Sequence, residues 1–259
     1  MTVSTTTTPA LETRGLTIRF GGHVAVDDVS CRFTPGTLTA IVGPNGAGKT
    51  TYFNLISGQL RATSGQVFVA GEDITSLPAS ARAKRGLGRA FQLTNLFPQL
   101  TALENVRLAV QSRADAGWSL FKVWNARRDL IEKADSILER VRLADKRHIA
   151  PKALSHGDQR KLEVALLIAM EPKVFMFDEP TAGMSVDEVP TVLELIHDIK
   201  RRGDATVLLV EHKMDVVRSL SDRIIVLHNG TLVADGEPAE VIASPVVQEA
   251  YLGVEVARA

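Results

Sequence analysis

The chain has 259 residues, of which 45% are hydrophobic and 23% are charged. These fractions are those of a globular protein, and they exclude a disordered, a collagen-like and a small disulfide-rich chain. Lysine and arginine total 30, as do aspartate and glutamate, so the zero net charge gives no global electrostatic reason to bind nucleic acid. Cys31 is the single cysteine, which excludes an intrachain disulfide and fits a reducing compartment.

No apolar run approaches the roughly 18–20 residues that a membrane-spanning helix needs. The longest runs cover only 164–170 and 206–210. The first ten residues lack the basic and apolar segments of a signal peptide. We therefore expect a cytosolic protein that can dock on a membrane partner, with a disordered tail at 1–10 and a second tail at 254–259.

The first third of the chain alternates short strands with turns. Strand patterns cover 11–20, 24–33, 38–42 and 66–70. The apolar run 38–42 suits a buried parallel strand, and a helix is expected from Lys49 to a stop at Gly58.

The middle of the chain changes to a helical pattern from about Thr101 to Leu143. One expected helix carries an apolar stripe of Ile131, Ala134, Leu138 and Val141. A second helix begins near Gly157 and ends at Glu171-Pro172, because a residue before proline avoids the helical conformation.

The α/β rhythm then returns. Strands are expected over 174–177, 206–210, 223–228 and 232–235, and helices over 188–202 and 214–220. Asn229-Gly230 is a strong signal for a two-residue hairpin turn. Strand–helix alternation on both sides of a helical segment predicts an α/β fold with a mostly parallel sheet and an inserted helical subdomain.

A phosphate-binding loop is the strongest local signal. It matches the pattern G-x-x-x-x-G-K-[ST] between an apolar strand and a helix, with Gly43, Pro44, Asn45, Gly46, Ala47, Gly48, Lys49 and Thr50. Glycines let the backbone N–H groups turn toward phosphate oxygens, Lys49 reaches the β- and γ-phosphates, and the Thr50 hydroxyl can bind Mg²⁺. A chance glycine-rich turn is the alternative, and the strand and helix around the loop argue against it.

Two acids, Asp178 and Glu179, end the apolar strand that starts at Val174. Side chains at the carboxyl end of a parallel strand project into the ligand crevice, so Asp178 can hold Mg²⁺ and Glu179 can orient an attacking water. The alternative is a pair of surface acids that begin a loop. His212 follows another apolar strand, and we expect it to contact the γ-phosphate rather than to fill a structural role.

Further motifs stand in a fixed order around these residues. The segment 154–159 reads Leu-Ser-His-Gly-Asp-Gln, which resembles the LSGGQ signature of ATP-binding cassette (ABC) ATPases, and Gln92 follows Arg-Ala-Phe as in the family's Q-loop. With the phosphate loop, the acid pair and His212, the resemblance covers almost the whole chain. It implies a P-loop NTPase fold with a mostly parallel sheet, an N-terminal antiparallel β subdomain and an inserted helical subdomain.

The resemblance also implies boundaries and roles. A single ABC ATPase domain would span 11–253, with a nucleotide-binding core of about 11–92 and 173–240 and a helical subdomain of about 93–172. The implied catalytic residues are Glu179, His212 and Lys49, and the implied Mg²⁺ ligands are Thr50, Gln92 and Asp178. The implied ATP contacts are Phe20, Val26, Gly43, Pro44, Asn45, Gly46, Ala47, Gly48, Lys49, Thr50, Thr51, Gln92, Ser155 and Gly157.

Three of these contacts have a specific form in the family. Phe20 matches the aromatic residue that stacks on adenine, although a core aromatic is the alternative. Ser155 and Gly157 match residues that touch the γ-phosphate of ATP bound to a second subunit.

Two residues depart from the family pattern. Asp158 stands where the family prefers glutamine; the helix dipole favours an acid there and a nearby phosphate disfavours it. We therefore expect Asp158→Gln to leave monomer stability nearly unchanged or slightly lower and to strengthen ATP-driven pairing. Ser185 stands where an aspartate usually closes the family's D-loop, and either Ser185 or Asp187 could instead cap the next helix.

The segments 20–26, 88–92 and 247–253 resemble the ATPases of importers for branched-chain and other hydrophobic amino acids. The ATPases of urea and amide importers have similar sequences in these segments. The resemblance implies a peripheral subunit on the cytoplasmic face of the inner membrane. Its partners would be a second ATPase subunit, identical or related and packed head to tail, permease subunits and, indirectly, a solute-binding protein, with no nucleic acid.

An apolar loop after Gln92 is the expected permease-docking surface, and packing against the chain's own helices is the alternative. Its members are Leu93, Leu96, Phe97 and Pro98. Two rival functions remain open, a soluble ABC protein acting on ribosomes or DNA and a small-molecule kinase. The single cassette and zero net charge disfavour the first, and the signature, Gln92 and His212 disfavour the second.

Overall fold

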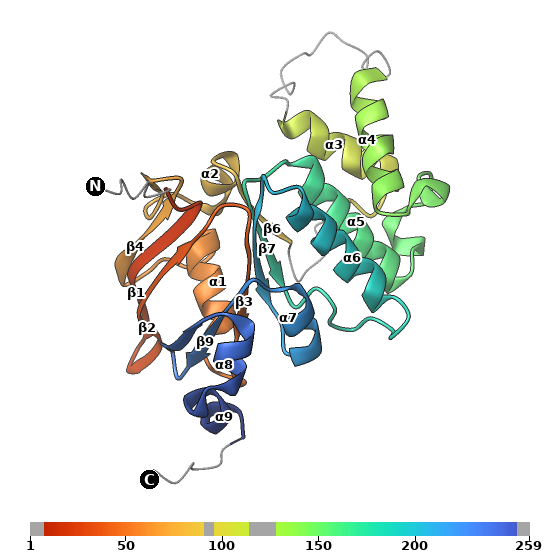
Figure 1. The fold of residues 1–259 in the computed structure, drawn as a ribbon. Helices are drawn as coiled ribbons and strands as arrows, with labels where there is room; N and C mark the ends of the chain where they lie inside the picture. The colour runs from red at the N-terminus through yellow and green to blue at the C-terminus, as the bar shows by residue number, and fades with distance from the viewer. Residues whose placement is uncertain (1–7, 91–95, 114–127, 253–259) are drawn as a thin grey trace, which may run out of the picture. The chain divides into compact units, whose positions relative to one another are not determined.

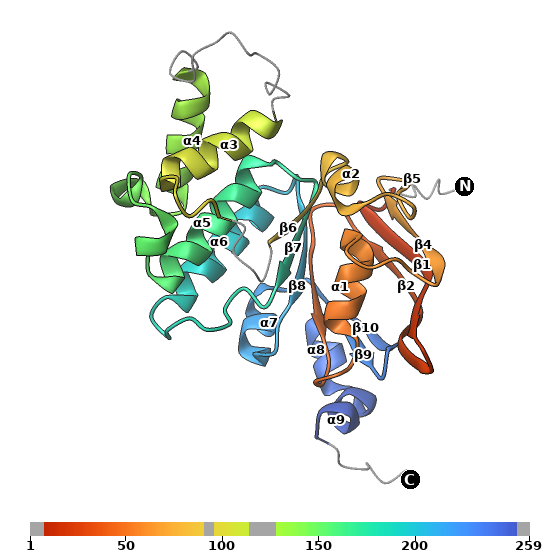
Figure 2. The ribbon, with the colours of Figure 1, turned by 180° about the vertical axis from the view of Figure 1, so that it is seen from behind.

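The computed structural model describes residues 8–90, 96–113 and 128–252, which form two compact units (Figures 1 and 2). The first unit contains the chain up to Leu87, the segment Lys173–Glu179 and the chain from Lys200 onward. The second contains Gly88–Pro172 and Pro180–Ile199. The expected tail residues 1–7 and 254–259 lie outside the described residues, as do Gln92 and Leu93.

An antiparallel sheet in the order β2-β1-β4-β5 forms one part of the first unit. Its strands are β1 (Leu11–Phe20), β2 (His23–Phe33), β4 (Ser64–Val69) and β5 (Glu72–Asp73). The two long strands pair from Leu11 opposite Phe33 to Phe20 opposite His23, so Gly21-Gly22 makes the turn between them. This sheet confirms the expected N-terminal antiparallel β subdomain.

A second sheet has the order β10-β9-β3-β8-β7-β6. Its strands are β3 (Leu38–Val42), β6 (Leu87–Ala90), β7 (Val174–Asp178), β8 (Thr206–Val210), β9 (Arg223–His228) and β10 (Thr231–Gly236). β3 pairs in parallel with β8 and β9, and β7 pairs in parallel with β8, which confirms the mostly parallel sheet. β9 and β10 form the expected antiparallel hairpin, whose turn residues Asn229 and Gly230 have φ of 49° and 79°.

The core of the first unit surrounds helix α1 (Lys49–Ser57), which lies between the antiparallel sheet and β3 in both views (Figures 1 and 2). Tyr52, Phe53 and Ile56 of this helix are completely buried. The Tyr52 hydroxyl lies 2.8 Å from the hydroxyl of Thr13, so its polar end keeps a partner inside the core. This packing holds α1 in place, and with it the loop that joins the end of β3 to the start of α1.

The second unit is helical. Its helices are α3 (Ala102–Arg113), α4 (Arg128–Arg140), α5 (His156–Ala169) and α6 (Val189–Arg201), the last of which continues into the first unit. A capping box starts α3, because the Thr101 hydroxyl accepts from the Glu104 N–H while the Glu104 carboxylate accepts from the Thr101 N–H. On α4 the buried face contains Leu130 and Ile137 with Ala134 and Leu138, so the stripe predicted from Ile131 was wrong by one position at its start.

Short elements complete the chain. They are α2 (Ala79–Lys84), α7 (Met214–Leu220), α8 (Pro238–Ala243), α9 (Pro245–Leu252) and two 3₁₀ turns, η3 (Ala144–Lys146) and η4 (Pro151–Ala153). Of these, sequence analysis predicted only α7. Within the described parts of the chain, every helix is too short or too polar to cross a membrane.

Candidate nucleotide-binding site

The phosphate loop joins β3 to α1, as its sequence predicts. Gly48 has φ of 96°, a left-handed conformation that favours glycine. A Cβ atom at this position would lie 2.4 Å from the carbonyl oxygen of Ala25, so the close approach of β2 also requires glycine. The loop therefore meets the start of α1 in a conformation in which backbone N–H groups can face an anion.

Lys49 lies across this loop. Its side chain is buried, and Nζ donates hydrogen bonds to the carbonyl oxygens of Gly43 at 2.7 Å and Pro44 at 2.9 Å. Burial lowers the pKa of Lys49 below its ordinary value, while the negative charges of Glu179 and Asp178 oppose this shift. The ammonium group thus interacts with the charges of both acids and is held by two neutral carbonyl oxygens, which a phosphate can replace.

The two acids follow β7 in different environments. Asp178 is the last residue of β7 and is only 3% exposed, whereas Glu179 is partly exposed. Glu179 has φ of 49°, which is unusual for a residue with a side chain, and its N–H donates to the carbonyl oxygen of Val210 on β8 at 2.9 Å. Backbone strain of this kind persists where the surrounding structure enforces it. At Glu179 the positive φ ends the extended strand conformation of β7.

His212 contacts Glu179 directly. Its Nε2 lies 2.7 Å from Oε1 of Glu179, and because a carboxylate only accepts, Nε2 is the donor. β7 and β8 run in parallel with Asp178 opposite Val210, which brings the residues after both strand ends together. The sequence predicts that His212 follows the end of a strand, but it does not predict this contact.

The oxygen donors of the first unit fit a magnesium ion. Thr50 offers a hydroxyl and Asp178 a buried carboxylate, the hard oxygen ligands that Mg²⁺ prefers. Among the described residues, no cluster of three or more His, Cys, Asp or Glu side chains forms a metal site. Such a donor set suits an ion that takes its remaining ligands from phosphates and water. The third expected ligand, Gln92, lies outside the described residues.

The other residues of this unit that we expected to contact the nucleotide differ in their exposure. Phe20 is 50% exposed at the end of β1, which argues against the alternative of a core aromatic and leaves a ring face for stacking. Val26 is completely buried in the hydrophobic core, so the structure corrects the expectation that its side chain touches ATP. Thr51 is half-buried in the first turn of α1.

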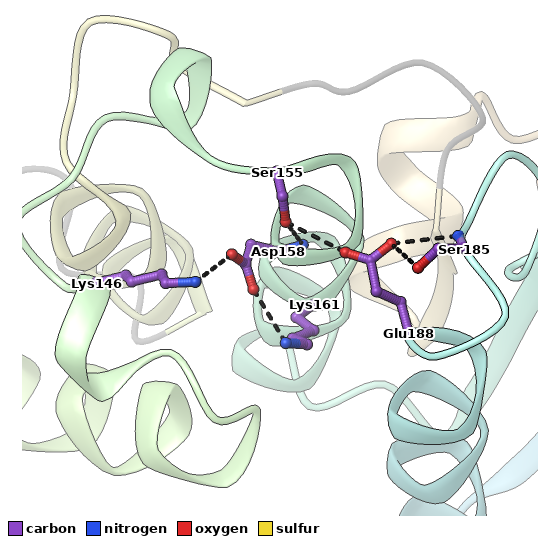
Figure 3. A network of polar contacts seen from close by, with 6 residues as sticks. All are labelled: Lys146, Ser155, Asp158, Lys161, Ser185 and Glu188. Atoms are coloured by element: carbon purple, nitrogen blue, oxygen red, sulfur yellow. Dashed lines mark hydrogen bonds and ion pairs between the residues drawn. The ribbon is translucent and has the colours of Figure 1, made fainter.

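The signature segment lies in the second unit, where it begins α5 (Figure 3). Ser155 caps the helix, because its Oγ accepts from the N–H of Asp158 at 3.1 Å. Oγ also lies 3.4 Å from Oε1 of Glu188. Sequence analysis missed Glu188, although the pattern Ser185-x-x-Glu188 before a helix is a capping signal.

Asp158 is bound by two lysines. Its carboxylate accepts from Nζ of Lys146 at 2.5 Å and from Nζ of Lys161 at 3.0 Å, and it faces both lysines in Figure 3. Burial raises the pKa of Asp158, but these hydrogen bonds outweigh burial and bring the pKa below its ordinary value. These contacts favour a larger loss of stability on replacing Asp158 than the sequence led us to expect, since the change removes the shared partner of two ammonium groups.

Ser185 takes part in the start of α6. Glu188 Oε2 accepts from the Ser185 hydroxyl at 3.0 Å and from its N–H at 3.3 Å. These contacts form half of a capping box in the turn before Val189, which supports the structural alternative for Ser185.

Comparisons with known proteins relate the chain to a family. The chain matches the family described as ABC transporter over residues 26–182, and the one described as branched-chain amino acid ATP-binding cassette transporter over 231–257. It is 38% identical to the high-affinity branched-chain amino acid transport ATP-binding protein BraF of Pseudomonas aeruginosa, over 95% of this chain and 98% of that protein. It is 36% identical to the corresponding protein LivG of Escherichia coli, with the same coverage.

Solved structures give the same result. The structure is similar to an ATP-binding cassette of an ABC transporter in its ADP conformation, with a TM-score of 0.81, 30% identity and coverage of 95% of this chain and 99% of that one. It also resembles a dimeric cassette in a post-hydrolysis state bound to ADP and phosphate, with a TM-score of 0.75, 25% identity and coverage of 88% and 98%.

Proposed function

Because the chain belongs to the ATP-binding cassette transporter family and is an ABC ATPase, we propose that it powers the import of branched-chain amino acids. The observation that carries this proposal is the site of the first unit. There the Lys49 ammonium lies within the electrostatic reach of Asp178 and Glu179, and Glu179 is bonded to His212.

Each group of this site has a distinct proposed role. Lys49 exchanges its two carbonyl acceptors for β- and γ-phosphate oxygens of ATP. Thr50 and Asp178 would hold Mg²⁺, with Gln92 as a third ligand, and the ion would supply positive charge next to the phosphates. Glu179 accepts a hydrogen bond from the attacking water, and His212 donates to the γ-phosphate. Phe20 stacks on the adenine ring.

A second ATP-binding subunit completes the proposed site. Ser155 and Gly157 of one subunit face the γ-phosphate held by the phosphate loop of the other. Nucleotide binding then closes the pair and hydrolysis opens it, which shifts the population of a two-state assembly. Permease subunits receive this motion, and a solute-binding protein acts through them. We place the pair at the cytoplasmic face of the inner membrane.

The permease-docking surface remains the loop after Gln92. Phe97 is 57% exposed, which is unusual for a large aromatic side chain, and Leu96 beside it is half-buried. Leu93 lies outside the described residues. A urea or amide importer is the alternative, and the match of residues 231–257 to the branched-chain amino acid family favours the first assignment.

Three variants and two solutes test the proposal. Lys49→Ala should lose most ATP affinity in calorimetric titration, because a charge-assisted hydrogen bond to phosphate contributes roughly 1.5–3 kcal/mol. Glu179→Gln should bind ATP normally and lose turnover, and Glu237→Gln, an exposed acid of the same unit, is the matched control. Cells that carry only the Glu179→Gln protein should fail to take up radiolabelled leucine. Normal leucine uptake with impaired urea uptake would refute the amino-acid assignment.

A further inference from the structure

The hydroxyl group of Ser155 is fully engaged within its own subunit. A lone pair of Oγ accepts the N–H of Asp158 at 3.1 Å, and the one hydroxyl proton faces Oε1 of Glu188 at 3.4 Å (Figure 3). A phosphate oxygen, like a carboxylate, accepts hydrogen bonds at neutral pH. Ser155 therefore cannot donate to a phosphate while it donates to Glu188.

Gly157 meets the same carboxylate. A Cβ atom on Gly157 would lie 2.2 Å from Oε1 and 2.3 Å from Cδ of Glu188. The Glu188 carboxylate thus lies against the bare Cα of this glycine as well as against Ser155. These are the two residues that the proposed function assigns to the phosphate of a neighbouring subunit, so one anionic group of the chain already lies where another is expected.

Glu188 is held at this place by the two serines, Ser155 and Ser185. Its second oxygen, Oε2, accepts from the hydroxyl and the N–H of Ser185. These hydrogen bonds lower the pKa of Glu188, so the carboxylate carries its charge at neutral pH. The ammonium group of Lys146 attracts Glu188 through its charge, but it forms its ion pair with Asp158, at 2.5 Å. Because Lys146 is shared with Asp158, it neutralises Glu188 only in part, and the remaining negative charge repels an incoming phosphate.

We propose that Glu188 is a built-in competitor for the nucleotide phosphate at Ser155 and Gly157, and that it weakens ATP-driven pairing of the subunits. The inference rests on the proposed function, and it takes a second copy of this chain as the subunit that presents the phosphate. On pairing, the Ser155 proton turns from Glu188 to the phosphate, while Ser185 keeps hold of the other carboxylate oxygen. The contact thereby connects the signature to the loop that follows Glu179.

Glu188→Gln tests the competition with little change in shape. The glutamine oxygen can still accept from Ser185, while the charge is gone and the amide can donate to a phosphate. Asp187→Asn is the matched control, because it removes one charge from the exposed neighbouring residue. Pairing of the full chain is measured by sedimentation velocity with Mg²⁺ and a non-hydrolysable ATP analogue, and thermal unfolding checks that each variant is folded.

We expect Glu188→Gln to pair about fivefold more tightly or better, since unit charges a few ångströms apart interact appreciably even in a medium as polar as water. Asp187→Asn should change pairing less than twofold, and the gain from Glu188→Gln should shrink as salt rises. A Glu188→Gln protein that pairs no more tightly than the wild type would overturn the inference.

A second variant, Ser155→Gly, distinguishes failure of the proposed competition from failure of the proposed function. Glycine is tolerated at the start of a helix but offers no hydroxyl to a phosphate. If Ser155→Gly loses pairing while Glu188→Gln pairs like the wild type, the competition is refuted and the signature keeps its role. If Ser155→Gly pairs like the wild type, Ser155 does not meet the phosphate, and both the competition and the proposed role of the signature are refuted. If no protein pairs, a second copy of this chain is not the partner; the inference is then refuted, while the proposed function stands with a related second subunit.

Discussion

Replacing Asp158 with asparagine removes one negative charge from between two lysines. Asp158 is 5% exposed and accepts from Lys146 on η3 and from Lys161 one turn further along α5. The side chain of Lys161 is only 16% exposed, whereas that of Lys146 is 37% exposed. The two ion pairs therefore differ in how strongly solvent screens them.

The expected loss in the free energy of unfolding follows from this difference in screening. A hydrogen bond to a charged group contributes about 1.5–3 kcal/mol when sheltered, and an exposed ion pair contributes about 0–1 kcal/mol. The asparagine oxygen can still accept from one lysine, and the variant no longer buries a charge, so part of the loss is recovered. The charge at the start of α5 also interacts favourably with the helix dipole by roughly 0.3–1 kcal/mol. We expect Asp158→Asn to lower the free energy of unfolding by about 1–2 kcal/mol.

Urea unfolding at pH 7 measures this loss, with Asp187→Asn as the control for an exposed aspartate. The folded-state pKa of Asp158 is lowered, so its contribution is present above its ordinary value of 3.8 and is lost as the pH falls through the folded value. Removing Lys161 as well should show coupling, because Lys161→Met costs less once Asp158 is gone. An Asp158→Asn protein as stable as the wild type at pH 7 would refute the reasoning.

Sequence patterns predict best where one local rule decides the structure. The segment Leu38–Val42 is apolar except for Thr39 because the strand is buried along its whole length, and Gly48 and Lys49 follow it because the phosphate loop needs both. The turn at Asn229-Gly230 is equally local, since both residues accept a positive φ. These features define the first half of the site before any tertiary contact is known.

Helix α2 shows why other elements escaped prediction. Its six residues carry no apolar period, and Arg82 holds it in place. The guanidinium of Arg82 donates to the carbonyl oxygens of Leu55 and Ile56 at the end of α1 and to those of Thr75 and Leu77. Such a helix depends on backbone groups that are distant in sequence, so no local pattern reveals it.

In the site, too, some features depend on the local sequence and others on contacts between distant segments. That Asp178 and His212 end two strands is evident in the sequence, but the bond between Glu179 and His212 depends on the parallel register of β7 and β8. Likewise, Lys161 is three residues from Asp158 and can be paired with it by helical spacing, whereas Lys146 comes from a turn that sequence analysis did not predict. Contacts between residues of one segment can therefore be predicted from the sequence. Contacts between residues of different segments depend on how those segments pack in the fold.

Two further predictions concern the first unit. His212→Ala should lower the rate of ATP hydrolysis at least roughly tenfold and leave ATP affinity nearly unchanged, because its proposed contact is made to the γ-phosphate; loss of both ADP and ATP binding in a folded protein would contradict this. Glu12→Gln should lower the free energy of unfolding by about 1 kcal/mol at pH 7, since Arg14 and Arg32 lower the pKa of Glu12 to about 2 but are themselves more than half exposed. The lowered pKa means that this stability is present above pH 4.5 and disappears as the pH falls toward 2, so the unfolding curves of the two proteins should converge in acid. A difference that stays constant down to pH 2 would show that Glu12 acts through its shape and hydrogen bonds rather than through its charge.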